Sequence, residues 1–187
     1  DQQVVIGEER GWPSPFTRTG PGVDSAIKPE LVDFAGAIRL ERGKILDPQR
    51  PLYAGIPTTS KDFAPPTGTM FRTVAGTSFA APRVANMAAQ IFNHFPEATS
   101  NLVRCLLVDS ASIPKNRPEK FVGIKPWDQK LLNVYGYGAA DLEGALWSTN
   151  NDCLLLAEDE IELDSFMIFE VPPIPSSFFQ TKGTGTL

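Results

Sequence analysis

The most constraining feature of this sequence is a run of apolar and small residues near its centre. Residues 79–92 are good helix formers and are apolar on almost every face of a helix. A helix of this kind belongs in the centre of a folded domain, where other elements cover it. Residues 69–74 read as a strand that leads through Gly76 into this helix. The order strand, tight turn, helix predicts an α/β architecture.

Further elements are expected on both sides of this unit. We predict short strands at residues 4–6 and 28–34, and a long loop from 39 to 66. A second helix, capped by Ser100 or Thr99, should run through Leu102, Val103, Leu106 and Leu107, with a third at about 139–147.

The character of the sequence changes after about residue 149. Apolar residues then flank an acidic turn at 158–160 with no helical period, which is typical of a β-hairpin. We therefore expect two regions: an α/β part over residues 1–149, and the start of a β-rich domain over residues 150–187. Because the chain has no initiating Met, we also expect it to be a piece of a longer protein.

Charge and composition exclude several classes of function. The 187 residues carry 17 Lys and Arg against 22 Asp and Glu, for a net charge of −5. No block of basic residues is longer than two, which argues against nucleic acid as a partner. No apolar run approaches the roughly 20 residues that span a bilayer. The two cysteines lack the clustering with His that zinc requires, and we expect Cys105 to be a buried core thiol.

The residue with the clearest chemical potential is Ser78. Gly76 permits a tight turn, which delivers Ser78 to the N-terminus of the central helix. Unpaired N–H groups and the helix dipole favour negative charge there, as an acyl-transfer nucleophile requires. The alternative is that Ser78 is an ordinary N-cap of a core helix.

Residues 76–82 read Gly-Thr-Ser-Phe-Ala-Ala-Pro and resemble the nucleophile motif Gly-Thr-Ser-x-Ala-x-Pro of the subtilisin-like serine proteases, the subtilases. Three other stretches resemble family segments in the same order, at 15–21, 27–32 and 135–140. The resemblance covers roughly residues 1–148. It implies a partial subtilisin-like fold, with a mostly parallel sheet flanked by helices. It also implies that Ser78 is the catalytic nucleophile and that its backbone N–H is part of the oxyanion hole, with motif support from Gly76, Thr77 and Pro82.

The departures from the family pattern are equally informative. A subtilase has a catalytic Asp, a catalytic His and an oxyanion-hole Asn before its serine, but no His and no Asn precedes Ser78 here. Asp24 lacks the glycine of the acid's motif and reads as a turn residue. The single histidine, His94, lies sixteen positions after Ser78, or about 24 Å along a helix. A general base must lie within about 3 Å, so we expect His94 to cap the helix end instead.

Two hypotheses follow. In the first, the chain is the C-terminal part of the catalytic domain of a serine endopeptidase that cleaves protein or peptide substrates, and it is inactive alone. In the second, it is a non-catalytic assembly or regulatory module built on a protease scaffold. Neither needs a cofactor, and a structural calcium ion in the full-length protein, not located here, stays open. We further expect self-association or pairing with the missing N-terminal half, through exposed apolar surface and strand edges.

Overall fold

The computed structural model describes residues 3–6, 10–41, 44–45, 55–64, 68–147 and 153–174. The described strands form two small sheets, in which every pairing is antiparallel. The first sheet has the order β1 (Gln3–Ile6), β2 (Ile38–Glu41), β3 (Lys44–Ile45). The second is a hairpin of β4 (Ile56–Thr59) and β5 (Phe71–Val74), with Ile56 opposite Val74.

The mixture of helices and strands agrees with the α/β class, but the described strands do not form the expected mostly parallel sheet. Parallel neighbours require crossover connections, whereas β2–β3 and β4–β5 are joined directly and fold back on themselves. Three of these strands, β2, β3 and β4, lie where a long loop was expected, whereas β5 confirms the strand predicted over residues 69–74. Residues 28–34 form no strand, although Val32 N–H donates to the Gly138 carbonyl at 2.9 Å.

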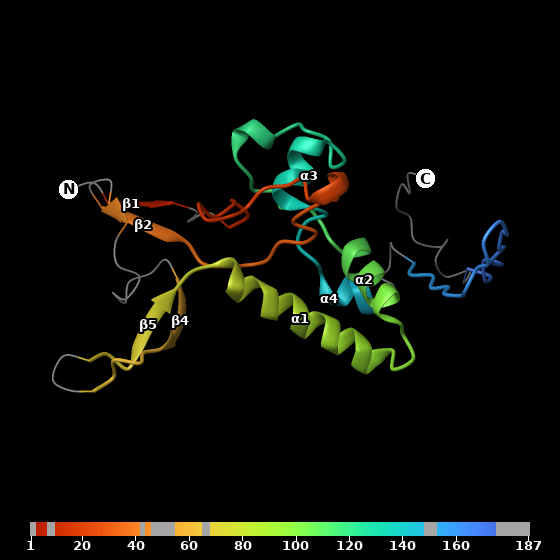
Figure 1. Ribbon diagram of the computed structural model, residues 1–187, viewed down its shortest axis with the longest axis horizontal. Coiled ribbons are helices and arrows are strands. Elements are labelled where there is room, and N and C mark those ends of the chain that lie inside the picture. The colour runs from red at the N-terminus through yellow and green to blue at the C-terminus, as the bar shows by residue number, and fades with distance from the viewer. Residues whose placement is uncertain are drawn as a thin grey trace.

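Four α-helices follow the second sheet along the chain, and α1 continues directly from β5 (Figure 1). They are α1 (Thr77–His94), α2 (Ser100–Asp109), α3 (Gln129–Tyr135) and α4 (Leu142–Leu146). The predicted cap of α2 is confirmed, since the Thr99 side chain accepts from the Leu102 N–H. Two short 3₁₀ helices occupy Val23–Ser25 and Glu119–Phe121. None of the described helices is long and apolar enough to cross a bilayer.

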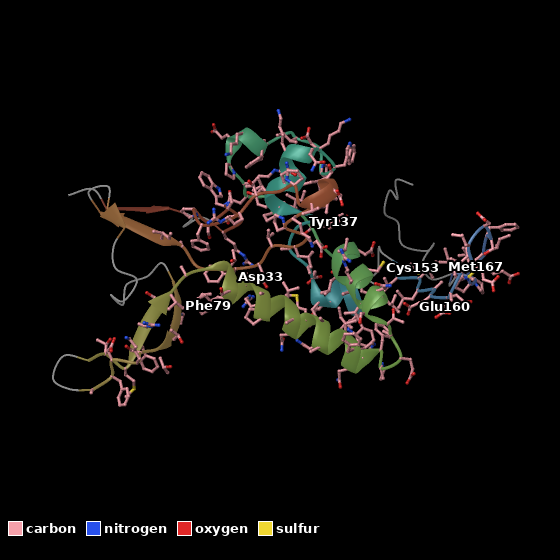
Figure 2. All side chains as sticks on the ribbon, viewed as in Figure 1. Asp33, Phe79, Tyr137, Cys153, Glu160 and Met167 are labelled. Atoms are coloured by element: carbon pink, nitrogen blue, oxygen red, sulfur yellow. The ribbon has the colours of Figure 1, made fainter. Side chains whose placement is uncertain are left out.

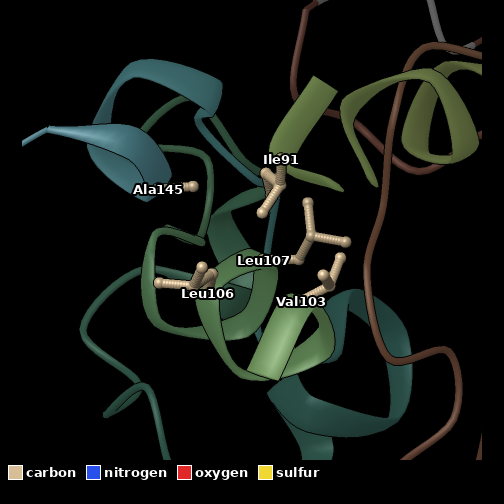
Figure 3. Packing of buried hydrophobic residues seen from close by; sticks show 5 residues of the cluster. All are labelled: Ile91, Val103, Leu106, Leu107 and Ala145. Atoms are coloured by element: carbon tan, nitrogen blue, oxygen red, sulfur yellow. The ribbon is translucent and has the colours of Figure 1, made fainter. Parts of the chain in front are cut away.

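The main core lies between α1, α2 and α4 (Figure 3). It is formed by aliphatic side chains from these three helices: Ile91, Val103, Leu106, Leu107 and Ala145. Only one side of α1 is covered in this way, so Ile91 is the buried residue of this helix. The expectation of a helix buried on all faces is therefore wrong for the described residues, because no described element covers the other side of α1.

A second, smaller core joins α3 to the segment before it. Phe121, Leu131 and Tyr135 are buried together, with the rings of Phe121 and Tyr135 in edge-to-face contact at 5.7 Å. The Tyr135 hydroxyl donates to the Gly11 carbonyl at 3.0 Å, and burial raises the pKa of this phenol. This contact ties the N-terminal turn region to α3.

Residues 153–174 form no strand, so the expected hairpin is not present in that range. An isolated two-stranded hairpin is marginally stable in water, and most apolar side chains of this segment have no described element to pack against. The segment is attached at its start, where Leu154 packs on the main core and Glu158 accepts hydrogen bonds from Thr99. Apolar side chains beyond it, such as Leu163 and Phe166, are exposed. The division at 149/150 stays a prediction, because residues 148–152 lie outside the described residues.

Candidate active site

The strand β5 leads through Ala75 and Gly76 directly into α1. Gly76 is the residue before the first helical position and has φ +157° and ψ 153°, a region of backbone space that is almost exclusive to glycine. A Cβ there would meet no atom closer than the Phe79 ring at 3.9 Å, so backbone conformation rather than space requires glycine. This turn sets the direction in which the chain enters α1.

Ser78 is the second residue of α1 and is exposed. The N-cap position belongs to Gly76, which has no side-chain capping bond, so the structure does not make Ser78 the cap of this helix. No hydrogen bond joins its hydroxyl to another of the described residues. Thr77 and Ser78 lie in the first turn, where backbone N–H groups have no acceptor within the helix. Within the part of the chain that the structure describes, the site therefore presents a hydroxyl without a hydrogen-bond partner beside N–H donors that the helix leaves unpaired.

Pro82 weakens the helix immediately around Ser78. It lies in the second turn of α1 rather than the first, four residues after Ser78. In that position an ordinary residue would donate its N–H to the Ser78 carbonyl, and proline cannot. The first turn of α1 consequently has fewer helical hydrogen bonds than the turns that follow.

A segment that is distant in sequence packs against this turn. The Gly76 N–H donates to the Ala35 carbonyl at 2.9 Å. Arg83, on the second turn of α1, forms an ion pair with Asp33, with 2.9 Å between Nε and Oδ1. Figure 2 shows Asp33 beside the N-terminal part of α1, near Phe79. Sequence reasoning missed both members of this pair, because neither belongs to the motif around Ser78.

His94 lies on the same unbroken helix as Ser78, at its opposite end. The distance expected from helix geometry therefore holds, and His94 does not reach Ser78. Its ring contacts Phe95 at 4.6 Å and Trp147 at 4.4 Å, both edge-to-face. The N–H that bonds the helix end belongs to Phe95, which donates to the Ile91 carbonyl, so His94 is an aromatic packing residue rather than the cap.

The remaining candidate residues are dispersed. Asp24 lies in an exposed turn with φ 54°, as expected of a turn residue. Cys105 is exposed, which corrects the expectation of a core thiol; on α2 it lies about 200° around the helix from buried Val103. Among the described residues no group of three His, Cys, Asp or Glu side chains is placed to hold a metal ion.

Comparison with known proteins gives two matches. The sequence model of the subtilase family matches residues 4–138. The chain is also 38% identical over 173 residues to the "uncharacterized protein y4bN" of Sinorhizobium fredii (strain NBRC 101917 / NGR234). That match covers 89% of this chain and 38% of the relative, so the chain spans less than half the length of that protein. No solved structure matches the chain.

Proposed function

The chain belongs to the subtilase family, and from this premise we propose that Ser78 is the nucleophile of a serine endopeptidase. In the proposed reaction the Ser78 Oγ bonds to the carbonyl carbon of a peptide, and its proton passes through a base to the leaving amine as the C–N bond breaks. Water then hydrolyses the acyl-enzyme ester. The substrate is a protein or peptide, and the reaction uses no cofactor.

The observation that carries this proposal is the geometry of the first turn of α1. An exposed serine hydroxyl, free of described partners, lies beside backbone N–H groups that no side chain caps. The Ser78 N–H is suited to an oxyanion hole, because a fixed donor stabilises charge that develops on the substrate oxygen. Gly76 supports this arrangement through its backbone conformation, and Thr77 and Pro82 complete the motif.

We propose that the activating residues lie on another part of the polypeptide. No His precedes Ser78, and His94 is at the far end of α1. A serine hydroxyl without a base is a poor nucleophile at neutral pH. The 187-residue chain alone is therefore inactive, and an Asp, a His and an oxyanion-hole Asn outside it complete the site.

A fluorophosphonate probe tests this proposal, since it reacts only with an activated serine. We expect no labelling of the 187-residue chain and prompt labelling of the longer polypeptide that contains it. Ser78→Ala in the longer polypeptide is the matched control and should abolish labelling. Labelling that survives this substitution would show that a different residue is the nucleophile.

The alternative is a non-catalytic assembly or regulatory module derived from a protease scaffold. The sequence upstream of Asp1 separates the two functions. An Asp-Ser/Thr-Gly turn, a His-Gly-Thr motif and a Gly-Asn loop there would support the protease. Their absence, with no labelling of the longer polypeptide, would support the module.

We also propose that the remainder of the polypeptide completes the fold. A mostly parallel sheet requires strands beyond those described here, and the open side of α1 offers small and apolar residues to cover: Ala81, Pro82, Ala85, Ala89 and Phe92.

Until it is covered, this apolar surface favours self-association of the 187-residue chain. Light scattering on dilution tests this, and a monomer at all concentrations would contradict it. Any structural calcium site would lie in the full-length protein.

A further inference from the structure

We infer that Asp33 and Arg83 form a positioning pair that holds residues 75–79, here called the nucleophile turn, in place; this inference rests on the proposed function of Ser78. The pair joins residues 33–36, here called the bracing segment, to the second turn of α1. Neither residue is proposed to touch the substrate. Their role is to fix the backbone that carries Ser78.

The carboxylate of Asp33 is itself held firmly. Its Oδ1 accepts from the Phe34 N–H at 2.6 Å as well as from Arg83 Nε at 2.9 Å. The Asp33 side chain is 13% exposed, whereas that of Arg83 is 54% exposed. Arg83 therefore reaches from the surface of α1 to a carboxylate that is fixed by its own backbone.

The bracing segment meets the nucleophile turn at two further points. The Ala35 carbonyl accepts from the Gly76 N–H at 2.9 Å, two residues before Ser78. Gly36, which has φ +79°, lies so close to Ala75 that a Cβ would approach its Cβ to 3.1 Å. Because Arg83 lies five residues after Ser78, the segment contacts the chain on both sides of the nucleophile.

The first turn of α1 needs such a support. It has no side-chain cap, and Pro82 removes the N–H that would bond the Ser78 carbonyl. A turn with few bonds of its own takes its position from what packs against it. Catalysis by a nucleophile is sensitive to this position, because a displacement of about 1 Å can lower a rate by about a hundredfold.

The second oxygen of Asp33 makes the pair more than an ordinary surface contact. Oδ2 is buried and has no hydrogen-bond partner among the described residues. Removal of the Arg83 guanidinium would leave a largely buried carboxylate with only the Phe34 N–H as its described donor. A buried charge that loses its partner is unfavourable, so the segment would move.

The chain supplies a matched control in Arg104. This arginine, on α2, forms an ion pair with Glu30, which lies in the same stretch of chain as Asp33. Arg104→Met removes a guanidinium that bonds a carboxylate of the same stretch, yet it does not disturb a direct contact between that stretch and α1. It should leave the nucleophile turn unchanged.

The first experiment measures peptide hydrolysis by the longer polypeptide. We expect Arg83→Met to lower kcat about tenfold or more with little change in KM, and Arg83→Lys to recover much of the loss. Arg104→Met should keep the unsubstituted kcat. Equal kcat in Arg83→Met and Arg104→Met would overturn the inference.

The second experiment does not depend on activity. Amide hydrogen exchange in the 187-residue chain reports the Gly76 N–H directly, and Arg83→Met should accelerate it several-fold while the Phe95 N–H at the far end of α1 is unchanged. Unchanged exchange at Gly76 would refute the positioning pair even with hydrolysis intact. Absence of Ser78-dependent hydrolysis in the unsubstituted polypeptide would instead refute the proposed function.

Discussion

The C-terminal half of α1 packs into the main core, whereas its N-terminal end does not. Ile91 is fully buried, and Met87 and Ala88 pack on the same cluster. Residues 77–83, all of them described, neither belong to a core cluster nor pack against one. The bracing segment holds this end instead, through one backbone hydrogen bond and one ion pair. One helix thus combines an anchored end with an accessible end that carries the chemistry.

This difference has a physical reason. An attacking hydroxyl must reach the substrate, so it cannot be buried among aliphatic side chains. Its position must nevertheless be fixed. A backbone hydrogen bond and an ion pair with a fixed carboxylate hold the first turn of α1 in position without covering the hydroxyl. Aliphatic packing at the other end supplies stability, because it removes apolar surface from water. The two ends should therefore respond differently to substitution.

The largest expected effect is on activity, at the accessible end. Ser78→Ala in the longer polypeptide should lower kcat at least about a thousandfold, because it removes the attacking atom. The free energy of unfolding of the 187-residue chain should change by less than about 0.5 kcal/mol, since the side chain is exposed. Steady-state kinetics and urea unfolding measure the two quantities. A large loss of stability would contradict the division of α1 into two ends.

The next effect is on stability, at the anchored end. Ile91→Ala should lower the free energy of unfolding by about 2–5 kcal/mol, because it leaves a cavity among α1, α2 and α4. Asn93→Ala, an exposed substitution on the same helix, should change it by less than about 0.5 kcal/mol. Urea unfolding monitored by circular dichroism compares them. Equal small effects would show that the cluster does not support the chain.

A smaller effect is expected where α2 begins. The Thr99 hydroxyl accepts from the Leu102 N–H at 3.3 Å and donates to Glu158. Thr99→Ala should therefore cost about 1 kcal/mol of unfolding free energy, as loss of an N-cap usually does. Ser100→Ala, the neighbouring exposed position, is the control. If both variants have the unfolding free energy of the unsubstituted chain, the Thr99 cap does not stabilise the packing of α2 on α1.

The sequence predicted the elements that depend on local signals. The strand before Gly76, the helix after it and the cap of α2 follow from periodicity, glycine placement and the preference of Thr for N-caps. The helix α3 was missed although it carries similar signals, with Asp128 as N-cap and Gly136 just past its end. The motif around Ser78 indicated the family, which the comparison confirmed over residues 4–138.

What the sequence did not predict depends on contacts between distant residues. Asp33 and Arg83 are fifty positions apart, and nothing local to either indicates the other. The antiparallel direction of the strands depends on how the connections fold back, which composition does not reveal. The prediction that Cys105 is buried was wrong, because apolar neighbours in the sequence do not show which face of a helix a residue occupies. The assignment of Ser78 as nucleophile stays a prediction.

The smallest expected effect concerns residues 28–33, a stretch that contacts both α2 and the N-terminal end of α1. Glu30 bonds Lys28 at 2.8 Å and also Arg104 on α2, and the same stretch reaches α1 through Asp33. The hydrogen bond from Lys28 lowers the pKa of Glu30 below its ordinary value of 4.5, with the charges of Lys28 and Arg104 acting in the same direction and burial opposing them.

Because the folded pKa is the lower one, the folded chain binds this proton more weakly than the unfolded chain. The contribution to stability is full above pH 4.5 and is lost as the pH falls through the lower folded value. It should be about 0.2–1 kcal/mol, since both cationic partners are more than half exposed. Urea unfolding of Glu30→Gln at pH 7 and at pH 3 measures it: the variant should be less stable than the unsubstituted chain at pH 7, and this deficit should shrink at pH 3. If the variant loses the same unfolding free energy at both pH values, Glu30 supports residues 28–33 by packing rather than by charge. The Asp33–Arg83 pair would then be the ion pair that holds this stretch against a helix.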